Sequence, residues 1–524
     1  MKRRDFLGAG LGAGLGSMVL SAASDAASAA QVAAQGKDAA LTGSDGIVQP
    51  RDVVFRVKPV VVSMIHTDSW EGPCRWKAIP PAQEKINADK QFAQWSKQIQ
   101  DWDFSGVPGV KFLEPAHLTF CEDFLIKPEQ WDKLAADAKL ADAYFVDPFT
   151  GMAGYQVAER FRKPLVFQGI STRWAHIASY ARSKGLECFA STDDFRSGTD
   201  IEGFKKLLAL LRARKVFAQT SVLSITNRGL PGECGLGVWD AQDLEKRLGV
   251  AVKSVSYKVL TDEMEQVLAS KSAAEIAEQA ADDLLRRADK SYIDRKYVVR
   301  SFQFYQTVQN LMNKYGCNSF TIDCFDFCAS RLPEKWTITP CLIHTLMKDR
   351  QIASACESDL SALLAMRMLM SVSNKSSHMG NCDQSNHIKG AFRVNHSVPG
   401  LKMNGFDQPD LPFQLGRFTN SAWGTKAIVD FVANREKTVT VARVNPSATK
   451  VLVLKGELVG AKGWSEDTIG CSVQADIKPP EGRFDEFDQK RADYGGHMQW
   501  VFGDYTNEMQ QLAEMLKLEI ELIS

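Results

Sequence analysis

The sequence has no excess of charge of either sign, since its 524 residues include 63 lysines and arginines against 63 aspartates and glutamates. A neutral chain has no field to hold nucleic acid or an anionic membrane, so neither is expected as a partner. Beyond residue 30 the chain also lacks the run of roughly 20 apolar residues that a membrane-spanning helix needs. Its charged fraction of 24% and hydrophobic fraction of 44% are ordinary for globular proteins and exclude a disordered chain.

The chain also lacks the cysteine pattern of a disulfide framework or of a structural zinc site. Its cysteines number 11, an odd count that favours free thiols. One C-x-x-x-C pair stands among Asp323, Cys324, Asp326 and Cys328, but no second pair matches it, so a zinc site there is only weakly indicated. The length suggests about three domains of roughly 150 residues each, ample to bury cores without disulfides.

The first thirty residues are predicted to be an export signal. Arg3 and Arg4 stand before an x-Phe-Leu sequence of the twin-arginine type, and a Gly- and Ala-rich apolar stretch follows. The stretch is too short for a membrane anchor, which is the alternative. Its G-x-G spacings imitate a dinucleotide fingerprint, but no strand precedes them, so we reject that interpretation.

Residues 1–30 are therefore expected to be a twin-arginine signal peptide, and residues 31–50 a flexible lead-in. An exported protein, periplasmic or otherwise extracytoplasmic, is implied, with the twin-arginine translocation machinery as its partner. Because that route carries proteins that have already folded in the reducing cytoplasm, free thiols are compatible with export.

The rest of the chain divides into three blocks by its pattern. In residues 51–170 and 171–340, short apolar runs alternate with amphipathic segments, which is typical of parallel sheets wound with helices. Residues 143–146, 215–218 and 438–444 are among the predicted strands. Residues 341–524 combine a long apolar helix with several β-like runs. The sequence thus predicts an α/β protein with two wound, Rossmann-like domains, followed by an α+β, β-rich C-terminal domain.

The polar residues of interest are concentrated in the third block. Glu357 opens the apolar helix, Asp383 lies in an Asn- and Gln-rich stretch, and His396 and His497 lie in later segments. Each has an ordinary explanation: Glu357 and Asp359 can complement a helix N-terminus, Asp383 can form a turn, and a lone histidine is usually structural. Together, two carboxylates and one or two histidines suit a site for Mn²⁺, Mg²⁺ or Fe²⁺.

From about residue 51 onward, and most clearly over 290–524, the chain resembles the L-fucose isomerase and L-arabinose isomerase superfamily. Six segments carry the resemblance in matching order: YVVRSFQFYQTVQNLMNKYGCNSFTIDCF (297–325), CESDLSALLAMRML (356–369), NCDQSN (381–386), NHSVPG (395–400), TVTVARVNPSATKVLVLKGELV (438–459) and GGHMQWVFGDYTNEMQQLAEMLKLEI (495–520).

The resemblance implies a metal-dependent aldose–ketose isomerase that acts on a pentose, hexose or 6-deoxyhexose through an enediol. It makes Glu357, Asp383 and His497 ligands of a divalent ion, Mn²⁺ with Mg²⁺, Fe²⁺ or Co²⁺ as alternatives. His396 would be a fourth ligand or a substrate contact. Glu357 and Asp383 would also be the catalytic acid and base. It further implies a homo-oligomer, and sugar contacts from Gln384, Asn386, Lys389 and Arg393.

A different class of protein stays open at this stage. A non-catalytic exported carbohydrate-binding protein with a degenerate isomerase fold would bind sugar between the two α/β domains without a metal. Its expected contacts are tryptophans and tyrosines, with Trp70, Trp174 and Trp239 as candidates. The two hypotheses differ in whether the carboxylates and histidines of the third block converge in one place.

Overall fold

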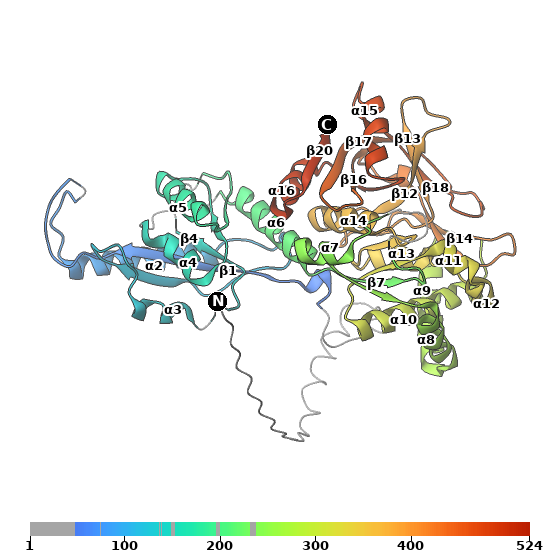
Figure 1. The fold of residues 1–524 in the computed structure, drawn as a ribbon, viewed down its shortest axis with the longest axis horizontal. Helices are drawn as coiled ribbons and strands as arrows, with labels where there is room; N and C mark the ends of the chain where they lie inside the picture. The colour runs from blue at the N-terminus through green and yellow to red at the C-terminus, as the bar shows by residue number, and fades with distance from the viewer. Residues whose placement is uncertain are drawn as a thin grey trace, which may run out of the picture. The chain divides into compact units, whose positions relative to one another are not determined.

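The computed structural model describes residues 48–73, 75–135, 137, 139–147, 152–194, 200–230 and 237–524, all within one compact unit that runs from Ser44 to Ser524 (Figure 1). The predicted signal peptide and most of the predicted lead-in lie outside the described residues and stay predictions. Within the described part of the chain, no helix is long and apolar enough to cross a membrane.

The first sheet is parallel and has six strands in the order β2-β1-β4-β5-β6, with β3 also paired to β1. Because helices cover a parallel sheet on both faces, its central strands are mostly apolar, and all residues of β4 and β5 are buried. The sheet continues past residue 170 through β6. Its elements are β1 (Phe55–Met64), α2 (Pro81–Gln100), β2 (Val110–Phe112), β3 (Ala116–Phe120), α3 (Asp132–Ala135), β4 (Ala143–Val146), α4 (Tyr155–Phe161), β5 (Leu165–Phe167), α5 (Thr172–Ser183) and β6 (Cys188–Ala190).

The second sheet is parallel with the order β11-β10-β7-β8. The two wound α/β sheets that the sequence predicts are therefore present. The elements of this part are α6 (Glu202–Ala218), β7 (Ser221–Ile225), α7 (Ala241–Leu248), β8 (Ala251–Val255), α8 (Tyr257–Ala269), α9 (Lys271–Arg287), α10 (Arg295–Tyr315), β10 (Ser319–Ile322), α11 (Cys324–Ala329), α12 (Leu332–Trp336), α13 (Cys341–Lys348) and β11 (Ser354–Cys356).

The predicted strand at 215–218 is wrong, because these residues form the last turn of α6. Leu210, Ala213 and Phe217 are buried at spacings of three and four residues, so the apolar stripe of the helix continues to its end. Lys215 fixes the same turn by donating to Asp142 at 2.7 Å. Tertiary contacts here override the strand preference of a short Val-Phe run.

The C-terminal part is built on an antiparallel sheet in the order β16-β19-β12-β13-β18-β17, which a further β16–β17 pairing closes into a barrel, and β20 adds to β17 in parallel. Its elements are α14 (Leu360–Ser373), β12 (His378–Gln384), β13 (Phe392–His396), β16 (Thr438–Val444), β17 (Lys450–Lys462), β18 (Val473–Lys478), α15 (Phe484–Lys490), β19 (His497–Phe502), α16 (Thr506–Leu516) and β20 (Glu519–Ile523).

The remaining regular elements are short. A small sheet has the order β15-β14-β9, with β9 (Lys290–Ser291), β14 (Phe413–Arg417) and β15 (Thr425–Val429), and 3₁₀ turns lie at Pro50–Asp52, Pro128–Gln130, Met152–Gly154, Phe431–Ala433 and Arg491–Asp493.

Helix α14 joins the second sheet to the barrel. It follows β11 after a three-residue turn and packs against β16 and β19. Because it is surrounded by sheet and helices, nearly its whole surface is apolar, and Leu363, Leu364 and Met368 are among its fully buried residues. The turn at its N-terminus is consequently held in a fixed position against the ends of the barrel strands.

Candidate active site

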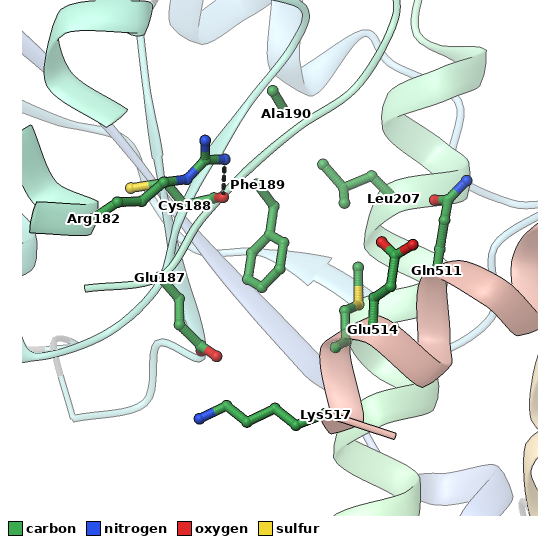
Figure 2. Close-up of a pocket in the computed structure, with 10 residues that line it drawn as sticks. Arg182, Glu187, Cys188, Phe189, Ala190, Leu207, Gln511, Glu514 and Lys517 are labelled. Carbon is green, nitrogen blue, oxygen red and sulfur yellow. Dashed lines mark hydrogen bonds between the residues drawn. The ribbon is translucent and has the colours of Figure 1, made fainter. Parts of the chain in front are cut away.

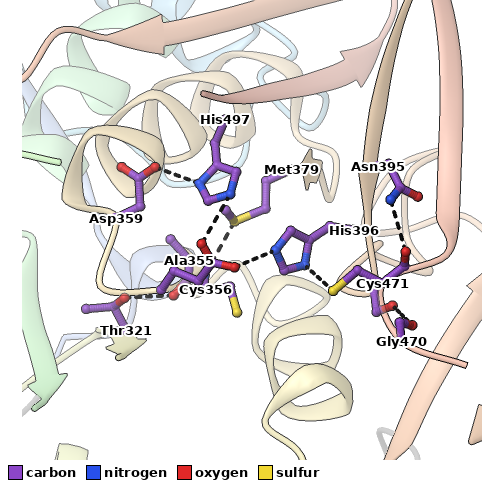
Figure 3. Close-up of polar contacts among 12 residues, drawn as sticks. Thr321, Ala355, Cys356, Asp359, Met379, Asn395, His396, Gly470, Cys471 and His497 are labelled. Atoms are coloured by element: carbon purple, nitrogen blue, oxygen red, sulfur yellow. Dashed lines mark hydrogen bonds and ion pairs between the residues drawn. The ribbon is translucent and has the colours of Figure 1, made fainter. Parts of the chain in front are cut away.

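Three segments that are far apart in the sequence bring their polar side chains together at the N-terminus of α14 (Figure 3). Glu357 lies in the turn between β11 and α14, His396 ends β13, and His497 begins β19. Oε1 of Glu357 lies 3.3 Å from Nε2 of His396, and Oε2 of Glu357 lies 3.6 Å from Nε2 of His497. One carboxylate is thus held between two imidazoles.

The turn that carries Glu357 has an unusual backbone. Glu357 and Ser358 adopt φ values of 61° and 53°, in the left-handed region that non-glycine residues avoid at a cost of about 1–3 kcal/mol each. The surroundings fix the turn: the Ser358 amide donates to the carbonyl of Ile322 at 3.0 Å, and the Asp359 side chain caps α14 by accepting from the Ala362 amide at 2.9 Å. Strain of this kind is typical of functional sites.

Asp359 also links His497 to a buried arginine. Its Oδ2 lies 2.9 Å from Nδ1 of His497 and 2.7 Å from Nη1 of Arg443, and the side chains of all three residues are at most 1% exposed. With Asp359 ionised, Nδ1 of His497 donates to it, and the ring then turns its Nε2 toward Glu357. The network therefore sets both the tautomer and the orientation of His497.

Gly495 makes room for this network. It adopts φ 110°, and a Cβ at this position would lie 2.7 Å from Nη2 of Arg443. We expect Gly495→Ala to lower the free energy of unfolding by at least about 1 kcal/mol in urea titration, because both backbone and packing are incompatible with a side chain. Gly482→Ala is the matched control, since Gly482 has φ 73° but no atom within 4 Å of its added Cβ. Equal losses in the two variants would contradict the steric part of this explanation.

The charges of the site favour an ionised carboxylate. Burial acts to raise the pKa of Glu357, but His396 and His497 outweigh it and hold that pKa below its usual value. Burial likewise acts to raise the pKa of Asp359, and Arg443 and His497 lower it. Burial acts to lower the pKa of His396, yet Cys471 and Glu357 raise it to about 10. Both carboxylates are therefore ionised at neutral pH.

The arrangement fits a divalent cation. The buried Nε2 of His497 makes no hydrogen bond and lies beside the Glu357 carboxylate, and the Nε2 of His396 lies on the other oxygen. Carboxylate oxygens with imidazole nitrogens suit ions such as Mn²⁺. The carboxylate of Asp359 behind His497 is the partner that metal-binding histidines usually have. The side chains present can therefore supply a carboxylate and two imidazoles to one ion.

Asp383 is placed differently from the other predicted ligands. It lies on β12, two residues beyond Asn381, which pairs with His497 in the sheet. At about 3.3 Å per residue, Asp383 is then about 7 Å further along the strand. Its carboxylate is 57% exposed and lies 3.3 Å from Nη2 of Arg393. Its role as a ligand and as a catalytic group stays a prediction.

The other predicted sugar contacts belong to the β12–β13 hairpin. Gln384 donates to Asp488 at 3.0 Å, Asn386 lies 2.8 Å from His387 through their side chains, and Lys389 is exposed. The structure thus keeps Gln384, Asn386, Lys389 and Arg393 on one hairpin, whose strand β13 ends at the site with His396. Their sugar-binding role stays a prediction.

Asp359 and Arg443 were not predicted as site residues. The sequence predicts only that Asp359 complements the helix N-terminus, a role that it does have. A signal for Arg443 was present, because a lone arginine inside the apolar strand Val441–Val444 has to find a buried acidic partner. Pairing the two in advance would have required knowing that β16 lies beside α14.

The tryptophans considered for sugar binding are scattered. Trp174 is 1% exposed and packs on Phe167 with ring centroids 4.6 Å apart, whereas Trp70 and Trp239 are exposed. A cavity of about 390 Å³ is lined from β6 and α16 by Cys188, Phe189, Glu514 and Lys517 among others, with no tryptophan (Figure 2). A second cavity, of about 370 Å³, has Trp174 in its lining, but its lining residues all lie between Phe167 and Ala190, on elements of the first sheet. The prediction of a tryptophan-lined cleft between two α/β domains therefore stays a prediction.

No family model matches the chain. It is similar to the sulfoquinovose isomerase of Clostridium sp. (strain MSTE9), with 26% identity over 326 residues, which are 60% of this chain and 68% of that protein. This similarity agrees with the sequence prediction of a sugar isomerase and supports an enzyme that interconverts aldose and ketose sugars.

Proposed function

We propose that the protein is a metal-dependent aldose–ketose isomerase that moves a proton between C1 and C2 of a sugar through an enediol. The observation that carries the proposal is the carboxylate of Glu357 held between His396 and His497, with Asp359 fixing His497 from behind. Glu357 lies at the N-terminus of a buried helix, so it reaches a substrate without moving the core.

Each residue has a defined task in this proposal. Glu357, kept ionised by the two histidines, takes the proton from one carbon and returns it to the other, and Asp383 is the proposed second acid–base group. Asp359 keeps the free nitrogen of His497 directed at the site. When bound by Glu357, His497, Asp383 and His396, a divalent ion such as Mn²⁺ supplies Lewis-acid stabilisation of the charge that develops on the sugar oxygens.

The substrate is proposed at the level of its class. A pentose, hexose or 6-deoxyhexose meets the chemistry of the site, and sulfoquinovose, from the name of the similar isomerase, belongs in the same screen. Export through the twin-arginine route and assembly into a homo-oligomer remain proposals drawn from the sequence.

The direct test is metal dependence combined with proton exchange. The purified protein is stripped with a chelator, reloaded with Mn²⁺, Mg²⁺, Fe²⁺ or Co²⁺, and incubated with each sugar in deuterated water. We expect deuterium at C2 and the matching ketose only with metal present, with Mn²⁺ among the active ions. Exchange that survives complete chelation, or its absence for every sugar and every ion, would contradict the proposal.

A further inference from the structure

A thiol that the isomerase chemistry does not use lies against the same carboxylate. The Sγ of Cys356, a carboxylate oxygen of Glu357 and a ring nitrogen of His396 all lie within 4.8 Å of one another. Cys356 and His396 are each 1% exposed and the Glu357 side chain is 12% exposed, so the three groups are largely shielded from solvent. Within the part of the chain that the structure describes, these three side chains place one ligand atom each close enough together to bind a single metal ion.

Glu357 has a different neighbour on each of its oxygens. Nε2 of His396 lies 3.3 Å from Oε1, and Nε2 of His497 lies 3.6 Å from Oε2. Cys356 adds sulfur to a set that contains His396, whereas the Asp359-backed His497 belongs to the purely oxygen-and-nitrogen set. The Glu357 carboxylate therefore lies between two sets of possible metal ligands, one that includes sulfur and one that contains only oxygen and nitrogen.

The set with sulfur suits a thiophilic ion. Zinc binds thiolate at about 2.3 Å and imidazole or carboxylate at about 2.0–2.1 Å in a tetrahedron, which places ligand atoms about 3.5 Å apart. The three observed atoms are close enough to reach that spacing through small side-chain rotations. Cys471 Sγ lies 3.7 Å from Nδ1 of His396 and orients the ring, so Nε2 is the nitrogen left for a metal.

Further sulfur lies beside the set. Cys324 stands two residues beyond Ile322, the strand partner of Cys356, so a second soft donor lies near the first. Both thiols are protonated in the metal-free protein, because burial raises the pKa of Cys356 to about 11. Zinc binding releases two protons to solvent, the thiol proton of Cys356 and the proton on Nε2 of His396.

We propose that Cys356, Glu357 and His396 form a thiophilic metal site that takes Zn²⁺ and shares Glu357 and His396 with the isomerase centre. The inference rests on the proposed function in one respect: a zinc ion there withdraws Glu357 from catalysis and so inhibits turnover. The binding itself is independent of any activity, which allows the two proposals to be tested apart.

Cobalt is the probe, because a cobalt–thiolate bond gives a charge-transfer band in the near ultraviolet. Metal-free full-length protein is titrated with Co²⁺. The band should appear in the wild type and be lost in Cys356→Ser and His396→Ala. It should also appear in the control variant Cys121→Ser, which changes a partly exposed thiol in the first α/β part. Zn²⁺ should abolish the wild-type band, and its affinity should fall at least about 100-fold in Cys356→Ser.

Thermal melting of each variant shows that it is folded before the spectra are compared. No band in the wild type, or an unchanged band in folded Cys356→Ser, overturns the inference. His497→Ala should keep the band and lose turnover. If no sugar is turned over but the band is lost in Cys356→Ser and His396→Ala, the thiophilic site stands and the isomerase proposal fails. If sugar is turned over but the wild type shows no band, the isomerase proposal stands and the thiophilic site fails.

Discussion

Glu357→Gln is expected to lower the rate of aldose–ketose exchange by about 10²- to 10⁴-fold, the range that positioned acid–base catalysis contributes. The amide has the shape of the carboxylate but cannot take a proton, and it is a poorer partner for the imidazoles 3.3 and 3.6 Å away. Deuterium exchange at C2, measured at saturating metal, is the readout, because it reports proton transfer even when little ketose accumulates.

Two controls make that result specific. Glu275→Gln removes an exposed glutamate on α9 and should leave exchange unchanged. The metal content of Glu357→Gln, measured at the metal concentration of the assay, separates a loss of proton transfer from a loss of metal. Wild-type exchange in folded Glu357→Gln would remove Glu357 from the mechanism, and with it the central observation of the proposed function.

The elements that the sequence predicts best are those whose burial is uniform. The predicted strand at 143–146 is β4 and the one at 438–444 is β16, because short apolar runs between turn residues leave few alternatives. The end of α6 was assigned wrongly because Val216 and Phe217 satisfy both patterns, and the contact that decides, Lys215 with Asp142, is made by a residue far away in the sequence.

The candidate site shows the same division. Glu357, His396 and His497 were singled out by residue type and order, and the structure brings them together. The partners that position them depend on which strands lie beside the N-terminus of α14, and strand order is not visible in a single sequence. Asp359 was therefore known as a helix cap but not as the link between His497 and Arg443.

Arg443→Met is expected to lower the free energy of unfolding by about 3–5 kcal/mol, the loss seen when one partner of a buried ion pair is removed. Arg443 and Asp359 are both 0% exposed, and the guanidinium also donates to the carbonyl of Tyr494 at 2.5 Å. Without the arginine, Asp359 remains buried as an anion with His497 and the Ala362 amide as its partners. The loss therefore comes mainly from a carboxylate that the core no longer neutralises.

Urea titration of the wild type and variants measures this loss. Arg417→Met is the matched control, because Arg417 pairs with Asp467 at 2.8 Å but both side chains are about one third exposed, and such pairs contribute about 1 kcal/mol or less. In the double variant Arg443→Met with Asp359→Asn, removing the orphaned charge should recover part of the stability but not the activity, because His497 keeps no anionic partner to fix its tautomer. Equal, small losses in Arg443→Met and Arg417→Met would show that the network contributes little to the fold, and His497 would then need another explanation for its orientation.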